Sequence, residues 1–113
     1  MNYTIAHIGI NCENSEQAEK AALLLGLMTG SQLRNTEASV FACTQFECLK
    51  QPGAGKNGHI AIAVDSVAEA ISELEQKGFT FRKDTAKYTP EGFLRLIYLN
   101  EEISGFAVHL TLK

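Results

Sequence analysis

The chain has 113 residues and a mass of 12.3 kDa, a length that indicates one compact domain. Apolar residue types make up 45% of it and charged types 20%, which excludes disordered, collagen-like and low-complexity classes. Ten Lys and Arg against 13 Asp and Glu give a net charge of −3, so no nucleic-acid partner is expected. Without a long apolar run or a visible signal peptide, no membrane association is expected and the location predicted is cytoplasmic.

The first half of the chain predicts one strand, one helix and three weaker strands. A strand is expected at residues 7–10, Asn14 or Ser15 is expected to cap the following helix, and Gly26 is expected to end it. Four apolar positions share one face of that helix: Ala18, Ala21, Ala22 and Leu25. The weaker strands are expected at Ser31–Asn35, Ser39–Thr44 and Phe46–Lys50.

The linker at residues 51–57 contains most of a glycine-rich motif that resembles a nucleotide-binding fingerprint. Residues 53–58 match G-x-G-x-x-G, the fingerprint of dinucleotide-binding proteins. That fingerprint must open a helix, because the pyrophosphate lies at the helix N-terminus. Here it continues into an expected strand, so we interpret it as a flexible crossing between two halves of the domain.

The second half predicts the same order of elements. A strand is expected at His59–Val64, followed by a helix that Asp65 or Ser66 caps and Gly78 ends, with Glu69 placed to complete a capping box. Its apolar stripe consists of Val67, Ala70, Ile71 and Leu74. The last strands are expected at Thr80–Lys83, Leu94–Leu99 and Phe106–Leu112.

The two halves are related by an internal repeat. His7-Ile-Gly-Ile10 matches His59-Ile-Ala-Ile62 at an offset of 52, and the register holds without a gap. The same offset places Asn14 on Ser66, Ala18 on Ala70 and Gly26 on Gly78. The predicted fold is therefore α+β, with tandem βαβββ modules at residues 2–50 and 58–113 in a single domain. Pseudo-two-fold symmetry would curl their mixed sheet around a cavity.

All three histidines lie in predicted strands, opposite the apolar faces. His7 and His59 open the first strands of the two halves, and His109 and Glu47 hold matching places in the last strands. If the first strands pair about the pseudo-two-fold axis, these four side chains converge in one cavity. Three imidazoles and a carboxylate suit zinc, nickel, iron or manganese. A single histidine in a strand is usually an ordinary polar residue, but three at repeat-related positions favour a metal site.

The cysteines do not suggest a competing site. Cys12, Cys43 and Cys48 are odd in number and form no C-x-x-C pair. They are expected to be reduced and mostly buried thiols, neither a disulfide framework nor a thiolate zinc site.

Four segments resemble the vicinal oxygen chelate superfamily, which includes glyoxalase I, methylmalonyl-CoA epimerase, extradiol dioxygenases and fosfomycin or bleomycin resistance proteins. They are His-Ile-Gly-Ile, Phe-Glu-Cys-Leu, Gly-His-Ile-Ala-Ile-Ala-Val and the final Gly-Phe-Ala-Val-His-Leu. The resemblance implies metal ligands at His7, Glu47 and His59. The fourth ligand, normally a glutamate, falls on His109. The ending is most similar to the glyoxalase-like domain joined to bacterial 2-keto-3-deoxy-6-phosphogluconate / 4-hydroxy-2-oxoglutarate aldolases.

The resemblance implies a metal-dependent protein of lyase or isomerase type. It would bind a small 2-oxo or 2-hydroxy acid through adjacent oxygens and remove a proton beside the metal-chelated carbonyl, with His109 and Glu47 as catalytic residues. A homodimer is expected. Family members pair their modules within one chain or exchange them between chains, and a chain of 113 residues fits either arrangement. Two alternatives stay open: a non-catalytic ligand-binding module accessory to a sugar-acid aldolase, and a structural pairing domain whose cavity is filled by side chains.

Overall fold

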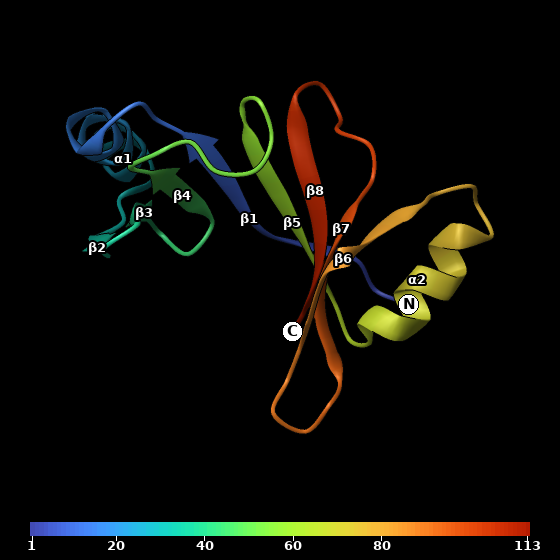
Figure 1. Ribbon diagram of the computed structural model, residues 1–113. Coiled ribbons are helices and arrows are strands. Elements are labelled where there is room, and N and C mark those ends of the chain that lie inside the picture. Colours follow the sequence, from blue (N-terminus) through green and yellow to red (C-terminus); the bar gives the residue numbers. More distant parts are fainter.

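The computed structural model describes all residues, 1–113, and contains one eight-stranded sheet and two helices (Figure 1). The elements of the first half are β1 (Thr4–Asn11), α1 (Ser15–Thr29), β2 (Leu33–Asn35), β3 (Ser39–Ala42) and β4 (Phe46–Leu49). Those of the second half are β5 (Gly58–Val64), α2 (Val67–Glu75), β6 (Phe81–Tyr88), β7 (Leu94–Leu99) and β8 (Phe106–Leu112). Neither helix combines the length and apolar character needed to cross a bilayer.

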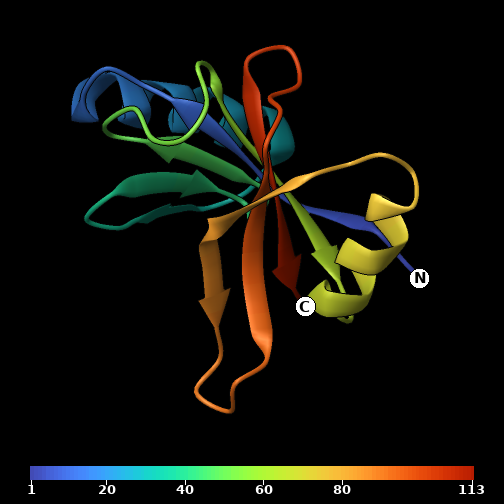
Figure 2. The ribbon, with the colours of Figure 1, turned by 45° about the vertical axis from the view of Figure 1, so that its right-hand side comes forward.

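The strand order is symmetric about the centre of the sheet. It runs β2-β3-β4-β1-β5-β8-β7-β6, with β1 antiparallel to β5 in the middle. On either side, β4 is parallel to β1 and β8 is parallel to β5. The strands fan out on both sides of this centre, and the sheet is strongly twisted and open at its edges (Figure 2). The predicted α+β fold of two βαβββ modules with pseudo-two-fold symmetry is confirmed.

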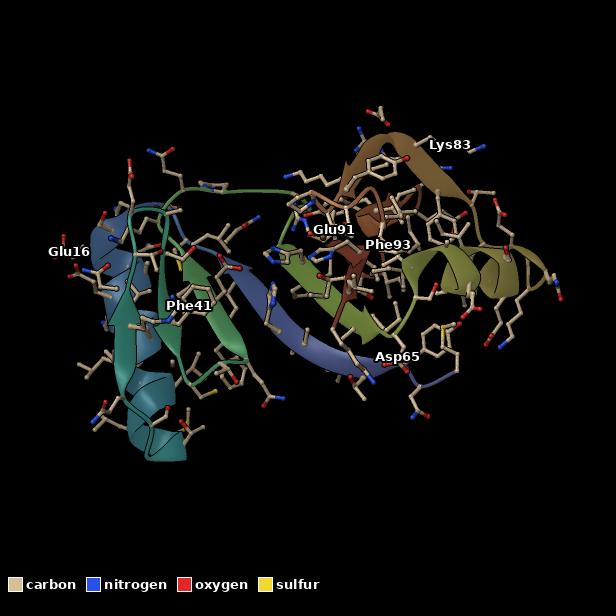
Figure 3. All side chains as sticks on the ribbon, turned by 90° about the horizontal axis from the view of Figure 1, so that it is seen from below. Glu16, Phe41, Asp65, Lys83, Glu91 and Phe93 are labelled. Carbon is tan, nitrogen blue, oxygen red and sulfur yellow. The ribbon has the colours of Figure 1, made fainter.

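Each helix covers its own half of the sheet, so the protein has two separate hydrophobic cores. Helix α1 packs on β3 and β4, and α2 packs on β7 and β8, at opposite ends of the molecule (Figure 3). The first core contains Cys12, Ala18, Ala22, Val40, Ala42 and Cys48; the second contains Val64, Val67, Ala70, Phe81, Ile97 and Leu110. Half of each predicted inward face belongs to these cores, and the other half, Ala21, Leu25, Ile71 and Leu74, is partly buried and packs against them. All three cysteines are free thiols, and burial raises the pKa of the Cys48 thiol to about 11.

The repeat holds at the start of both helices. The side-chain oxygen of Asn14 accepts a hydrogen bond of 2.9 Å from the Gln17 backbone N–H. In the same way, the Ser66 hydroxyl oxygen accepts one of 3.2 Å from the Glu69 N–H. Each cap satisfies an N–H group that has no partner within the helix. The capping residue is therefore the same position of the repeat in both modules.

The expected end of the first helix is wrong. Helix α1 continues past Gly26 to Thr29, and Gly30 ends it in the left-handed conformation with φ 67°. Gly26 is buried inside the helix, where an added Cβ would lie 2.8 Å from a methyl carbon of Leu33. Gly26 thus allows the helix to pack closely against Leu33, and it does not terminate the helix. In the second half Gly78 does follow the helix with φ 96°, as expected.

The linker, which we expected to be a flexible crossing, makes hydrogen bonds to both halves of the sheet. The Asn11 side chain accepts a hydrogen bond of 3.0 Å from the Gly53 N–H and donates one of 2.9 Å to the Gly55 carbonyl. The Asn57 N–H donates to the Gly105 carbonyl at 2.7 Å. The glycine-rich motif continues directly into β5, as predicted. Polar backbone groups of the crossing are thus paired with the ends of β1 and the β7–β8 turn.

Strand β6 is longer than the predicted Thr80–Lys83 and reaches Tyr88. Its pairing with β7 is irregular between Arg82 and Lys87. There the Thr85 hydroxyl accepts a hydrogen bond of 2.9 Å from the Tyr98 N–H, in place of a backbone carbonyl. An exposed edge strand with such an irregularity lacks the apolar alternation that marks a strand in the sequence.

Gly30→Ala should lower the free energy of unfolding by about 1 kcal/mol, measured by urea denaturation. The added Cβ meets no atom within 4 Å, so the cost comes from the left-handed backbone alone. Gly30→Asn is the matched control and should cost less, because asparagine tolerates this conformation. Equal stability of the Ala variant and the native chain would contradict a helix end at Gly30.

Candidate metal centre

The pairing of four strands gathers the candidate ligands on one face of the sheet. Across β1 and β5, His7 lies opposite Ala61, and Gly9 lies opposite His59. On the outer sides of this pair, Gly9 also lies opposite Glu47 of β4. Ala61 likewise lies opposite His109 of β8. Directly opposed residues share a face of the sheet, so all four side chains project to the side that the helices leave free.

The side chains of this cluster make direct polar contacts. The Nε2 atoms of His7 and His59 are 3.1 Å apart. Oε1 of Glu47 lies 3.5 Å from Nε2 of His7 and 3.3 Å from Nε2 of His59. His109 completes the group, since one ligand nitrogen from each of the three imidazoles lies within 4.8 Å of the others. The His7 and His59 rings are edge to face at an interplanar angle of 89°.

These distances fit a divalent ion. Nitrogen and oxygen ligands about 2.0–2.1 Å from a tetrahedral zinc ion lie about 3.3 Å from one another. The three separations between ligand atoms of His7, Glu47 and His59 are 3.1, 3.3 and 3.5 Å. The donor set of imidazole and carboxylate also suits nickel, iron and manganese. The residues therefore fit a metal, with His109 beside the same space.

Ser39 orients the carboxylate of Glu47. Its hydroxyl donates a hydrogen bond of 2.7 Å to Oε2 of Glu47, and the serine is only 1% exposed. This contact fixes Oε2, so that Oε1 faces the two imidazoles. Ser39 was missed in the sequence, although the hairpin of β3 and β4 places Ser39 on the face opposite the buried Val40. An orienting partner of this kind usually raises the affinity of a site for its metal.

Tyr98 is a second neighbour that the sequence did not reveal. It lies opposite His109 across β7 and β8, and the two ring centroids are 4.9 Å apart. Burial and the nearby Glu47 charge raise the pKa of the Tyr98 hydroxyl. Nδ1 of His109 is 3.3 Å from the Leu110 carbonyl oxygen. When Nδ1 carries the hydrogen and donates to that carbonyl, Nε2 keeps its lone pair.

The electrostatics leave the cluster ready to bind a cation. Burial lowers the pKa of His109 to about 4 and also lowers the pKa of His7, to which the neighbouring His59 contributes. Hydrogen bonding from His59, with a further contribution from Ser39, lowers the pKa of Glu47 despite its burial. At neutral pH, His7 and His109 are therefore uncharged, and Glu47 is ionised. These are the protonation states in which imidazole and carboxylate bind metals.

Gly9 makes room for one of the imidazoles. A Cβ added at this position would coincide with the His59 ring, in contact with its Cε1 and Nδ1 atoms. The His59 ring therefore lies flat against the backbone of β1, where no larger residue fits. The glycine of the His-Ile-Gly-Ile segment is thus part of the site and not only of the strand.

Solved structures of other proteins share this fold. A hypothetical protein, BH1468 from Bacillus halodurans C-125, aligns with a TM-score of 0.63 and 18% identity over 100% of this chain and 96% of that one. Two variants of Streptomyces coelicolor methylmalonyl-CoA epimerase, in complex with 2-nitronate-propionyl-CoA, align with TM-scores of 0.60 and 0.58. Their identities are 16% and 15%, and the alignments cover 96% and 97% of this chain and 96% and 94% of theirs.

No protein-family model matches the sequence, and the search of curated proteins finds no relative. Methylmalonyl-CoA epimerase belongs to the vicinal oxygen chelate superfamily, so the likeness supports the resemblance stated from the sequence at the level of the fold. The more specific similarity to the aldolase-associated domain stays a prediction.

Gly9→Ala should weaken binding of zinc or nickel by roughly tenfold or more, because the new methyl group displaces the His59 ring. Isothermal titration calorimetry measures the affinity, and thermal melting in EDTA checks that the fold persists. Gly30→Ala is a suitable control, since it changes stability without touching the cluster. Unchanged metal affinity in folded Gly9→Ala protein would show that His59 does not bind the ion.

In EDTA, the free energy of unfolding should fall by roughly 2–3 kcal/mol between pH 7 and pH 4.5. The folded protein holds His109 with a pKa of about 4, below the ordinary histidine value of 6.5 that is expected when the chain unfolds. Between these values the unfolded chain binds a proton that the folded protein does not, so acid favours unfolding. His109→Gln should flatten this dependence in urea titrations; an unchanged slope would contradict a buried neutral His109.

Proposed function

We propose that this chain is a metal-dependent protein that acts on a small 2-oxo or 2-hydroxy acid, in the manner of glyoxalase-like lyases and isomerases. The observation that carries the proposal is the convergence of three imidazoles and one carboxylate from four neighbouring strands. The separations among His7, Glu47 and His59, together with an uncharged His7 and an ionised Glu47 at neutral pH, support a divalent ion, which is zinc, nickel, iron or manganese in this proposal.

In this proposal His7, Glu47 and His59 hold the ion, and His109 takes the fourth position as a ligand or as a base. The ion, when bound, supplies a Lewis acid that polarises a carbonyl group. With Nδ1 of His109 turned to the Leu110 carbonyl, its Nε2 would accept a proton from the carbon beside the substrate carbonyl. Ser39 keeps the Glu47 carboxylate aimed at the cluster during this transfer.

The charge of the site distinguishes it from the glutamate-ended sites that the resemblance implies. Glu47 contributes one negative charge, and His109 contributes none at neutral pH. A site with one carboxylate leaves more positive charge on the ion than a site with two. That surplus favours binding of an anionic substrate, in agreement with a 2-oxo or 2-hydroxy acid.

The alternative is a non-catalytic module that binds the same ligand for a sugar-acid aldolase. The low pKa of His109 favours this alternative, since a strongly weakened base removes protons slowly. Proton exchange separates the two functions, because sequestration of a ligand requires no proton transfer.

The metal-loaded protein should exchange the C3 protons of 2-oxobutanoate for deuterium in D2O, measured by NMR. His109→Gln tests the fourth position. If His109 is the base, the ion stays bound and exchange falls by ~10²–10⁴. If His109 is a ligand, the variant loses metal affinity, and His109→Glu should restore it by adding a negative charge.

Two results would contradict the proposal. The first is the absence of any bound zinc, nickel, iron or manganese, by elemental analysis and by thermal shift, in protein without a histidine tag. The second is binding of metal and 2-oxobutanoate without exchange in the native chain, which would establish the binding module.

Ser39→Ala, which leaves all four donors in place, should weaken metal binding by roughly tenfold.

A further inference from the structure

Two arginines occupy equivalent places in the two halves of the sheet. In the first half, one cross-strand row runs from β2 to β5: Arg34, Phe41, Glu47, Gly9 and His59. In the second half, the matching row runs from β6 to β1: Arg82, Tyr98, His109, Ala61 and His7. Each row reads arginine, aromatic residue, candidate ligand, small residue and histidine. Both arginines therefore belong to the face that carries the metal centre.

The two arginines differ in what they contact. The Arg34 guanidinium lies over the Phe41 ring, 4.3 Å from its centroid, in a cation–π contact. None of the cavities in the structure is lined by Arg34. Arg82, in contrast, lines a cavity of about 210 Å³ together with Tyr98 and Ala107.

This cavity lies beside the candidate metal centre, and two of its lining residues, Tyr98 and Ala107, are cross-strand neighbours of candidate ligands. Tyr98 lies opposite His109, and Ala107 lies opposite His59. The Cα atoms of Arg82 and His109 are separated by two strand spacings, about 10 Å. A ligand bound at the histidines can therefore extend toward Arg82.

The Arg82 guanidinium is available to such a ligand. Its only ion pair is with Asp84 at 3.2 Å, and these side chains are 53% and 73% exposed. Exposed pairs of this kind contribute little free energy, so an anion from the ligand can replace Asp84. Arg82 is the one cation among the residues that line the cavity. Glu102 also lines it and is exposed.

We propose that Arg82 binds a second anionic group of the substrate, a carboxylate or a phosphate, several bonds away from the oxygens that face the histidines. The inference rests on the proposed function and narrows its substrate class to 2-oxo or 2-hydroxy acids with a distal anionic group. Arginine suits this role because its planar donors match carboxylate and phosphate oxygens. Arg34 has no such role, since its guanidinium is stacked on Phe41.

The test compares matched probes by calorimetry with the zinc-loaded protein. 2-Oxoglutarate should bind about tenfold more tightly than 2-oxopentanoate, which has a methyl group in place of the distal carboxylate. Arg82→Gln should bring this ratio close to one, whereas Arg34→Gln should leave it unchanged. Asp84→Asn should increase the affinity for 2-oxoglutarate by about threefold, because it removes the competing carboxylate. Tighter binding of 2-oxo-4-phosphonobutanoate than of 2-oxoglutarate would identify phosphate as the preferred group.

A second arm, glutarate with the metal-free protein in EDTA, separates this proposal from the proposed function. Equal affinities of the two 2-oxo acids, with no effect of Arg82→Gln, would overturn the Arg82 subsite and leave the metal-dependent function standing. If neither 2-oxo acid binds but glutarate binds and Arg82→Gln weakens it, the metal-dependent function would be overturned and the Arg82 subsite supported. Binding of none of the probes would overturn both.

Discussion

The antiparallel pairing of β1 with β5 is the constraint on which the rest of the structure depends. It is the one place where the two halves join in the sheet, and its register places Gly9 against His59 and His7 against Ala61. Because strand side chains alternate between faces, a slip by one residue would turn one of the histidines toward the helices. The cluster exists only in the observed register, and its glycine position admits no larger residue.

Around this symmetric centre the two halves have become chemically different. Glu47 and His109 hold equivalent positions, one on each side of the central pair. Glu47 is supported by the hydroxyl of Ser39, which favours its charged form. His109 is buried against Tyr98, which favours its neutral form. A repeated fold thus supplies one anionic and one neutral donor to the same space, a combination that strict symmetry would not give.

The sequence predicted the features that follow from periodicity and repetition. Alternation in the strands placed His7 and His59 on the face away from the helices, and the offset of 52 aligned Asn14 with Ser66, the residues that cap the two helices. It could not predict features that depend on contacts between distant residues. Gly26 looks like a helix end, but it is an interior residue packed on Leu33. Ser39 contacts Glu47 only because β3 and β4 form a hairpin, and the sequence marks those short strands weakly.

His7 and His59, beside the pseudo-two-fold axis, do not have equivalent surroundings. This difference sets the direction from which a ligand reaches the site. Two imidazoles related by the pseudo-two-fold cannot occupy the same space, so the rings meet edge to face with centroids 5.1 Å apart. The His59 ring lies flat on Gly9 and its side chain is 9% exposed, whereas that of His7 is 26% exposed. Ala61, which lies opposite His7, carries a Cβ, so the His7 ring cannot lie against the backbone as the His59 ring lies against Gly9. Solvent and small ligands therefore meet the cluster first at His7.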